Sequence, residues 1–233
     1  DTLTTRHNIA YWQGVAGDAV GARTALAEVL ADLVQELGED HPDTLTTRHN
    51  IAYWQGVAGD AVGARTALAE VLADRIRVLG EEHPHTLSAR DSLARWQGES
   101  GDSAGAAIAF ASLLADQSRV LGNDHPDTLS TLSALARWRA ETGDTAGTTT
   151  ALTNLLVGQI GTLGNDHPDT LSTRFGLAFF HAQAGRTDEA ITLLEQMIAD
   201  SQRVQESGHL AAAAEALHAL QHARRGDVSP PSE

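Results

Sequence analysis

Apolar residues recur along this chain at spacings of three and four, the period of an amphipathic helix. After Pro42 they stand at Leu45, Ile51, Ala52 and Trp54, and this spacing predicts a helix of about four turns. In the next segment they form one broad stripe that ends before Gly80: Ala64, Ala67, Leu68, Val71, Leu72, Ile76 and Leu79. Two consecutive helices of this kind predict a helical hairpin.

Residues that start and stop helices stand between these stripes. Pro42 fixes a helical φ at the start of the first helix, and Asp43 or Thr44 offers a side-chain oxygen to the free amides of the first turn. Gly59 tolerates the left-handed conformation that ends this helix, and Asp60 caps the next one. The pattern therefore predicts helices joined by short turns.

The hairpin pattern repeats with a period of 42 residues. A His-Pro pair marks each period, and a Leu-Gly pair precedes it at a constant interval: His41-Pro42, His83-Pro84, His125-Pro126 and His167-Pro168. Residues 1–32 are identical to residues 43–74, which indicates a recent duplication. Repeats of this length are typical of solenoids, in which stacked hairpins bury a shared core.

We expect one all-α domain over residues 1–225, an α-solenoid of five helix-turn-helix repeats with a concave and a convex face. The expected repeats are 1–38, 39–80, 81–122, 123–164 and 165–208, followed by a capping helix at 209–225 and a disordered tail at 226–233. Asp1 stands inside the repeat pattern, as in a longer array, so the first hairpin is expected to expose an apolar face.

The unit resembles the tetratricopeptide repeat of the kinesin light chain type, whose period is the same 42 residues. The matching positions are Asn50-Ile51-Ala52, Gly59, Ala64, Ala67-Leu68, Leu79-Gly80 and His83-Pro84, and the fifth unit adds Asp188-Glu189-Ala190. The resemblance covers about residues 1–208. It implies a right-handed superhelical stack that binds an extended peptide or a partner helix along the concave face, which the first helix of each repeat lines.

The sequence departs from that family pattern in two columns. The tyrosine that the family has late in the first helix is replaced by Gln13, Gln55, Gln97, Arg139 and His181. A large aromatic residue stands one place before each of them: Trp12, Trp54, Trp96, Trp138 and Phe180. We expect these aromatic residues to form the core between repeats. Glycine replaces the glutamate of Glu-Ala at Gly21, Gly63, Gly105 and Gly147. With Gly158 and Gly161 added, the second helix of the fourth repeat is expected to be the weakest.

Two rows of first-helix residues are the candidate binding groove. The first row lies one helical turn before the Gly-Asp pair that ends each first helix: Tyr11, Tyr53, Arg95, Arg137 and Phe179. The second row lies one helical turn earlier: His7, His49, Asp91, Ser133 and Phe175. Beside the second row stand Asn8, Asn50 and Ser92. Similar chemistry at a fixed rise suits an extended chain, since the amides can bind its backbone and the two arginines a carboxylate. Two alternatives stay open: exposed ion pairs for Arg95 and Arg137, and plain packing for the tyrosines.

Composition narrows the classes of partner. The chain has 31 Asp and Glu residues against 16 arginines and no lysine, a formal net charge of -15 that repels nucleic acid and anionic membranes. The absence of cysteine excludes disulfides and thiolate sites. No apolar run approaches the roughly 20 residues of a spanning helix and no secretory segment opens the chain, so we expect a cytoplasmic protein. The lysine-free composition indicates a GC-rich bacterial genome of actinobacterial type.

Catalytic, metal and cofactor chemistry are not expected. The histidines of successive His-Pro pairs lie about one helix spacing, roughly 10 Å, apart, whereas zinc ligands all lie about 2 Å from the ion. His218 and His222 lack both the glutamate of the zincin pattern and a third ligand. Gly14, Gly17 and Gly21 follow no strand, and a P-loop needs a lysine that this chain lacks.

The preferred hypothesis is therefore a non-catalytic scaffold that binds a peptide or a partner protein in the concave groove. The resemblance implies one alternative, a carboxy-terminal sensor array of a larger NB-ARC-type nucleotide-switch signalling protein. Self-assembly through the open amino-terminal face is another, because the duplicated segment favours exchange of register between chains and thus a homo-oligomer.

Overall fold

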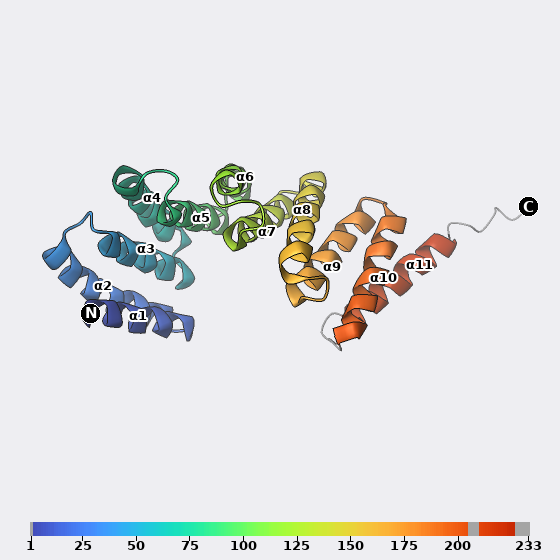
Figure 1. Cartoon of the computed structure of the whole chain (residues 1–233), viewed down its shortest axis with the longest axis horizontal. Coiled ribbons are helices and arrows are strands. Elements are labelled where there is room, and N and C mark those ends of the chain that lie inside the picture. The colour runs from blue at the N-terminus through green and yellow to red at the C-terminus, as the bar shows by residue number, and fades with distance from the viewer. Residues whose placement is uncertain (1, 205–209, 227–233) are drawn as a thin grey trace, which may run out of the picture. The chain divides into compact units, whose positions relative to one another are not determined.

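Eleven helices and no strand make up the part of the chain that the computed structural model describes, residues 2–204 and 210–226 (Figure 1). In order they are α1 (Thr2–Val15), α2 (Ala19–Leu37), α3 (Pro42–Val57), α4 (Ala61–Leu79), α5 (Pro84–Glu99), α6 (Ser103–Val120), α7 (Pro126–Glu141), α8 (Thr145–Leu163), α9 (Pro168–Gln183), α10 (Thr187–Val204) and α11 (Leu210–Gly226). The all-α prediction is confirmed. His209 of the expected capping helix and residues 227–233 of the expected disordered tail lie outside the described residues.

The histidine of each His-Pro pair caps the helix that follows it. His41 Nδ1 accepts a hydrogen bond from the Asp43 amide at 3.2 Å, and the other three histidines of this column do the same. The expectation that Asp43 or Thr44 caps this helix is wrong, because the imidazole of His41 accepts the hydrogen bond from the first-turn amide. The Thr44 hydroxyl instead donates to the Gly38 carbonyl at 2.8 Å and ties the helix to the preceding turn.

A second cap joins the two helices of a hairpin. Gly59 ends α3 with a φ of 105°. The Asp60 carboxylate then accepts hydrogen bonds from Gln55 Nε2 at 2.6 Å and from the Gly63 amide at 2.8 Å. Both bonds lower the pKa of Asp60, and the bond from Gln55 has the larger effect. A Cβ atom on Gly63 would lie 2.2 Å from Asp60 Oδ2. The glutamine and the glycine that depart from the family pattern therefore belong to one capping motif.

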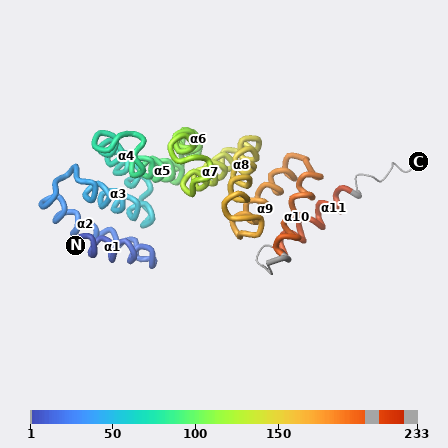
Figure 2. Tube along the Cα trace, in the orientation of Figure 1, coloured from blue at the N-terminus to red at the C-terminus, as the bar shows by residue number. Residues whose placement is uncertain are grey.

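Contacts divide the chain into two compact units, Asp1–Val120 with α1 to α6 and Leu121–Glu233 with α7 to α11. Within the first unit each helix packs against the next, and the first helices α1, α3 and α5 also contact their counterparts in the neighbouring repeat. Within the second unit α7 to α11 pack in the same sequential way. The backbone trace shows these successive hairpins in each unit (Figure 2). The prediction of stacked helix-turn-helix repeats is confirmed within each unit.

Tryptophans form the seams between repeats in the first unit. Trp54 is 5% exposed and packs against the hairpin of α1 and α2, where a Cβ atom on Gly14 would lie 2.5 Å from the indole ring. Trp96 packs on Gly56 in the same way. The expectation of a core position is wrong for Trp12, which lies on α1 outside these seams and is 65% exposed.

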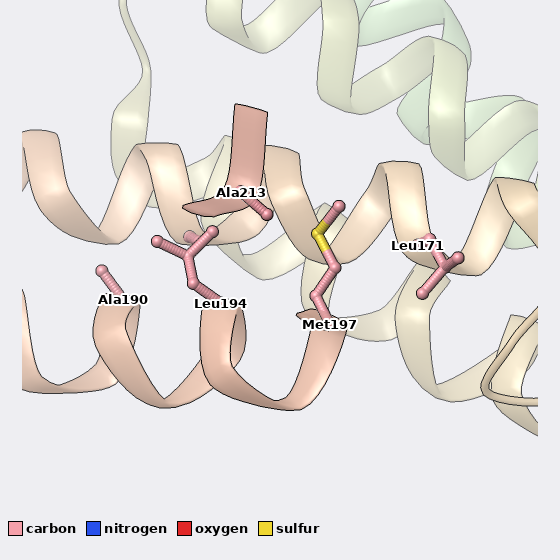
Figure 3. Close-up of a cluster of buried hydrophobic side chains, with 6 residues drawn as sticks. Leu171, Ala190, Leu194, Met197 and Ala213 are labelled. Carbon is pink, nitrogen blue, oxygen red and sulfur yellow. The ribbon is translucent and has the colours of Figure 1, made fainter. Parts of the chain in front are cut away.

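One core cluster of the second unit lies where α9, α10 and α11 meet (Figure 3). Leu171 of α9, Leu194 and Met197 of α10 and Ala213 of α11 are each at most 2% exposed. Ala213 is small, so α11 approaches α10 closely and covers its apolar stripe.

Candidate functional site

Aromatic and cationic side chains of the first helices form a continuous row across the first unit. The Tyr11 ring lies edge-on to Trp54 with centroids 5.7 Å apart, and Tyr53 lies edge-on to Trp96 at 6.0 Å. The Arg95 guanidinium carbon lies 5.8 Å from the centroid of the Tyr53 ring and 5.5 Å from that of Trp96. We call this surface the first-helix row: Tyr11, Tyr53 and Arg95. Each repeat thus places one exposed or half-buried ring or cation beside the next.

His7, one turn earlier, joins α1 to α3 through both of its ring nitrogens. The Thr47 hydroxyl donates to the Asp43 carbonyl, so it accepts from His7 Nδ1 at 2.9 Å. Asn50 Nδ2 then donates to His7 Nε2 at 3.0 Å. Burial lowers the pKa of His7, so the neutral ring suits these bonds. Asn8, which follows His7, is exposed and lines a pocket of about 200 Å³ with it.

His49 occupies the same position one repeat later, but it is buried. Its Nδ1 faces the Arg75 guanidinium at 3.3 Å, and its Nε2 faces the Ser92 hydroxyl at 3.2 Å. Arg75, 2% exposed, also donates to the His85 carbonyl at 2.6 Å. Burial, and then the charge of Arg75, lower the pKa of His49 to about 3. His49 of α3 therefore links α4, through Arg75, and α5, through Ser92. The residue at the same position of α5 is Asp91, which is half-buried.

The predicted residues of the second unit fall into two places. Ser133 and Arg137 are exposed on α7, and the Arg137 guanidinium carbon lies 4.4 Å from the centroid of the Trp138 ring. Phe175 and Phe179 of α9 line an apolar pocket of about 200 Å³ against α10 and α11. Ser133 lines a separate, larger pocket of about 770 Å³ between α7, α8 and α9.

That larger pocket contains residues which the sequence analysis did not select. Gln159 is 9% exposed, and its Oε1 has no hydrogen-bond partner among the described residues. Asp124 and Asp169 contribute carboxylates. A comparison of repeat columns would have revealed Gln159. Its column reads Leu33, Arg75, Gln117, Gln159 and Ser201, which is polar in four of five repeats although every member is buried.

Over residues 2–204 and 210–226, no three histidine, aspartate or glutamate side chains converge as a metal site would require. The His218 and His222 rings lie side by side on α11, with centroids 4.5 Å apart and ring planes tilted by 57°. In the same described part, none of the helices combines the length and the apolar character needed to cross a membrane.

Comparison with known proteins gives one family and a set of similar folds. The profile of the tetratricopeptide repeat matches residues 2–43, 44–85 and 170–211. A protein of Podosopora anserina described as a kinesin light chain with nearly identical TPR-like repeats is 28% identical, with a TM-score of 0.76 over 88% of this chain and 98% of that one. No curated protein matches the chain in sequence.

Two more distant structures share the fold alone. The apo form of RapI is 11% identical, with a TM-score of 0.72 over 96% of this chain and 84% of that one. A Rap protein complexed with competence and sporulation factor is 12% identical, with a TM-score of 0.57 over 95% of this chain and 65% of its own length.

Proposed function

Because this chain belongs to the tetratricopeptide repeat family, we propose that it is a non-catalytic scaffold which binds an extended peptide, or an extended segment of a partner protein, on its first helices. The observation that carries this proposal is the first-helix row, in which rings and a guanidinium of successive repeats touch one another. A surface of this kind offers aromatic and charged contacts at a fixed rise.

The row is suited to binding because its side chains are held in place before a ligand arrives. Tyr53 and Arg95 both lie against Trp96, which packs the third repeat on the second. One turn earlier, His7 and His49 link neighbouring first helices by hydrogen bonds. Ordered aromatic side chains lose little conformational entropy on binding. The exposed Arg95 guanidinium carries donors of the kind that bind a carboxylate or a backbone carbonyl.

A structure of the same fold supports a role in recognition. The Rap protein named above was determined in complex with competence and sporulation factor. That complex is a property of the Rap protein, and for this chain it adds a precedent from the fold to the observation on the row.

The proposal is tested by selecting binders from a random peptide library displayed on phage. The native chain should enrich a family of peptides. Arg95→Glu combined with Arg137→Glu should weaken their binding at least about tenfold, the effect of losing a charged hydrogen bond, with an unchanged circular dichroism spectrum. Arg23→Glu combined with Arg65→Glu is the matched control, since it makes the same charge change on the second helices. Failure to enrich any peptide, or equal binding by both double variants, would contradict the proposal.

Self-association is a second candidate, favoured by one exposed surface. Ile9, Trp12 and Val15 of α1 are 64%, 65% and 52% exposed, and they form an apolar face on one helix. Sedimentation velocity over a range of concentrations should then show an association that Trp12→Ser abolishes. A monomer at all concentrations would exclude this candidate. A place in a nucleotide-switch protein stays a prediction from the resemblance.

A further inference from the structure

The pocket between α7, α8 and α9, with a volume of about 770 Å³, is larger than the pocket at the matching seam of the first two repeats. The equivalent seam between the first two repeats holds a pocket of about 200 Å³, lined by His7 and Leu33 among others. In the fourth repeat the corresponding residues are Ser133 and Gln159. Serine is much shorter than histidine, so this seam is left open.

An ion-pair network that other repeats share is also missing here. Arg48 of α3 pairs with Asp74 of α4 at 2.7 Å, and Arg77 joins Asp74 to Asp40. The third repeat has the same network in Arg90, Asp116, Arg119 and Glu82. In the fourth repeat Leu132, Gly158 and Gly161 stand at the positions of Arg48, Asp74 and Arg77. Of the network, this repeat retains only Asp124, at the position of Asp40. The arginine that would neutralise Asp124 is therefore absent from α8.

The groups that line the pocket suit a cation with several hydrogen-bond donors. Asp124 and Asp169 supply carboxylates, and Ser130 and Ser133 supply hydroxyl oxygens. The Asp169 carboxylate also lies 3.7 Å from His167 Nδ1. That nitrogen accepts a hydrogen bond from the Asp169 backbone amide, so it carries no proton to donate to the carboxylate. Gln159 is more than nine-tenths buried, and its Oε1 accepts no hydrogen bond from the described residues. An anion would be repelled here.

The chain itself shows that this kind of seam accommodates a guanidinium. Two repeats earlier, in the column of Gln159, stands Arg75, which is buried and donates to the His85 carbonyl and to His49. The residues equivalent to His49 and His85 are Ser133 and Asp169, both of which line the open pocket. The open seam thus offers the same backbone position, and it adds a carboxylate where the first unit has an imidazole.

We propose that this pocket receives the guanidinium of an arginine side chain of the bound peptide, in the place that Arg75 fills in the first unit. The proposal rests on the peptide-binding function proposed above and names a feature of its ligand. It also fits the net charge of -15, which favours basic partners.

The test is an NMR titration of the isotope-labelled full chain with Nα-acetyl-arginine methylamide and with its neutral citrulline analogue. The arginine probe should cause saturable shifts confined to amides of residues 130–133, 159–163 and 169–173. The citrulline probe should bind about tenfold more weakly or not at all, because it lacks the charge. Absence of saturable shifts in these segments, or equal binding of the two probes, would overturn the proposal.

Variants locate the binding and control for folding. Asp124→Asn combined with Asp169→Asn should weaken the arginine probe about tenfold, and Gln159→Arg should abolish binding by filling the pocket as Arg75 fills its own. Asp127→Asn combined with Asp166→Asn makes the same charge change at the matching positions of the adjoining repeats and should bind as the native chain does. Equal loss in this control would refute the pocket. The peptide selection above is independent of this titration, so either proposal can fail alone.

Discussion

Replacing Trp54 by alanine should destabilise the first unit strongly, whereas the same replacement at Trp12 should have a small effect. The two tryptophans stand at the same position of two identical 32-residue segments, so local sequence is the same around both. They differ in what covers them: Trp54 is 5% exposed in the seam against α1 and α2, and Trp12 is 65% exposed. The pair therefore separates the contribution of the seam from that of helix propensity.

The expected magnitudes follow from burial. Truncation of a buried tryptophan to alanine costs about 3–5 kcal/mol, because transfer free energy is lost and a cavity remains beside Gly14. Trp12 keeps about one third of its surface covered, so its truncation should cost roughly 1 kcal/mol or less. The helix propensity of alanine slightly exceeds that of tryptophan, and this gain is the same at both sites.

Urea unfolding followed by far-ultraviolet circular dichroism gives the comparison. With a slope of about 1–3 kcal/mol per molar urea, the midpoint for Trp54→Ala should fall by more than about 1 M, and that for Trp12→Ala by a few tenths. Repeat arrays need not unfold in one step, so tryptophan fluorescence should be followed alongside in a Trp138→Phe background, in which the remaining tryptophans all lie in the first unit. Equal midpoint shifts for the two variants would refute the account of the seams.

Three further predictions address the seams, the buried histidine and the caps. Gly14→Ala should lower the thermal midpoint, because the new Cβ atom would clash with Trp54. Gly161→Ala places its Cβ atom in open space and should raise the free energy of unfolding by about 0.5–1 kcal/mol. A stabilised Gly14→Ala variant and a destabilised Gly161→Ala variant would contradict this prediction. The pKa of His49 is lowered to about 3, so the unfolded chain binds more protons below about pH 6.5, and stability should fall as pH drops from there towards 3. At pH 5 this amounts to about 2 kcal/mol, and His49→Gln should flatten the unfolding free energy measured against pH; an unchanged slope would argue against it. Asp60→Ala should cost about 1 kcal/mol in chemical denaturation by removing the cap of α4, and no change would show that the cap is dispensable.

The sequence predicted the helices and their turns because these depend on local signals. The positive φ of Gly59, the aspartate cap and the helix begun at Pro42 follow from residues within a few positions of each other. The capping role of the histidines was not predicted, because an imidazole is an unusual cap and the neighbouring Asp43 offered the ordinary one.

Contacts between repeats were harder to predict. The burial of His49 depends on Arg75 and Ser92, which lie 26 and 43 residues away, and its identical counterpart His7 is only half-buried. The pocket of the second unit is lined by residues of α7, α8 and α9, so no single segment indicates it. Column-by-column comparison of the repeats carries that information, since it shows where Leu132, Gly158 and Gly161 replace charged residues.

The central claim is that the ligand lies along the first-helix row. It is tested by placing the photo-crosslinking residue benzoylphenylalanine at Tyr11 of α1 or at Val20 of α2, both exposed in the same hairpin. A peptide selected by the native chain should crosslink to the Tyr11 position and not to the Val20 position. Equal labelling at both positions, or labelling at Val20 alone, would contradict the account.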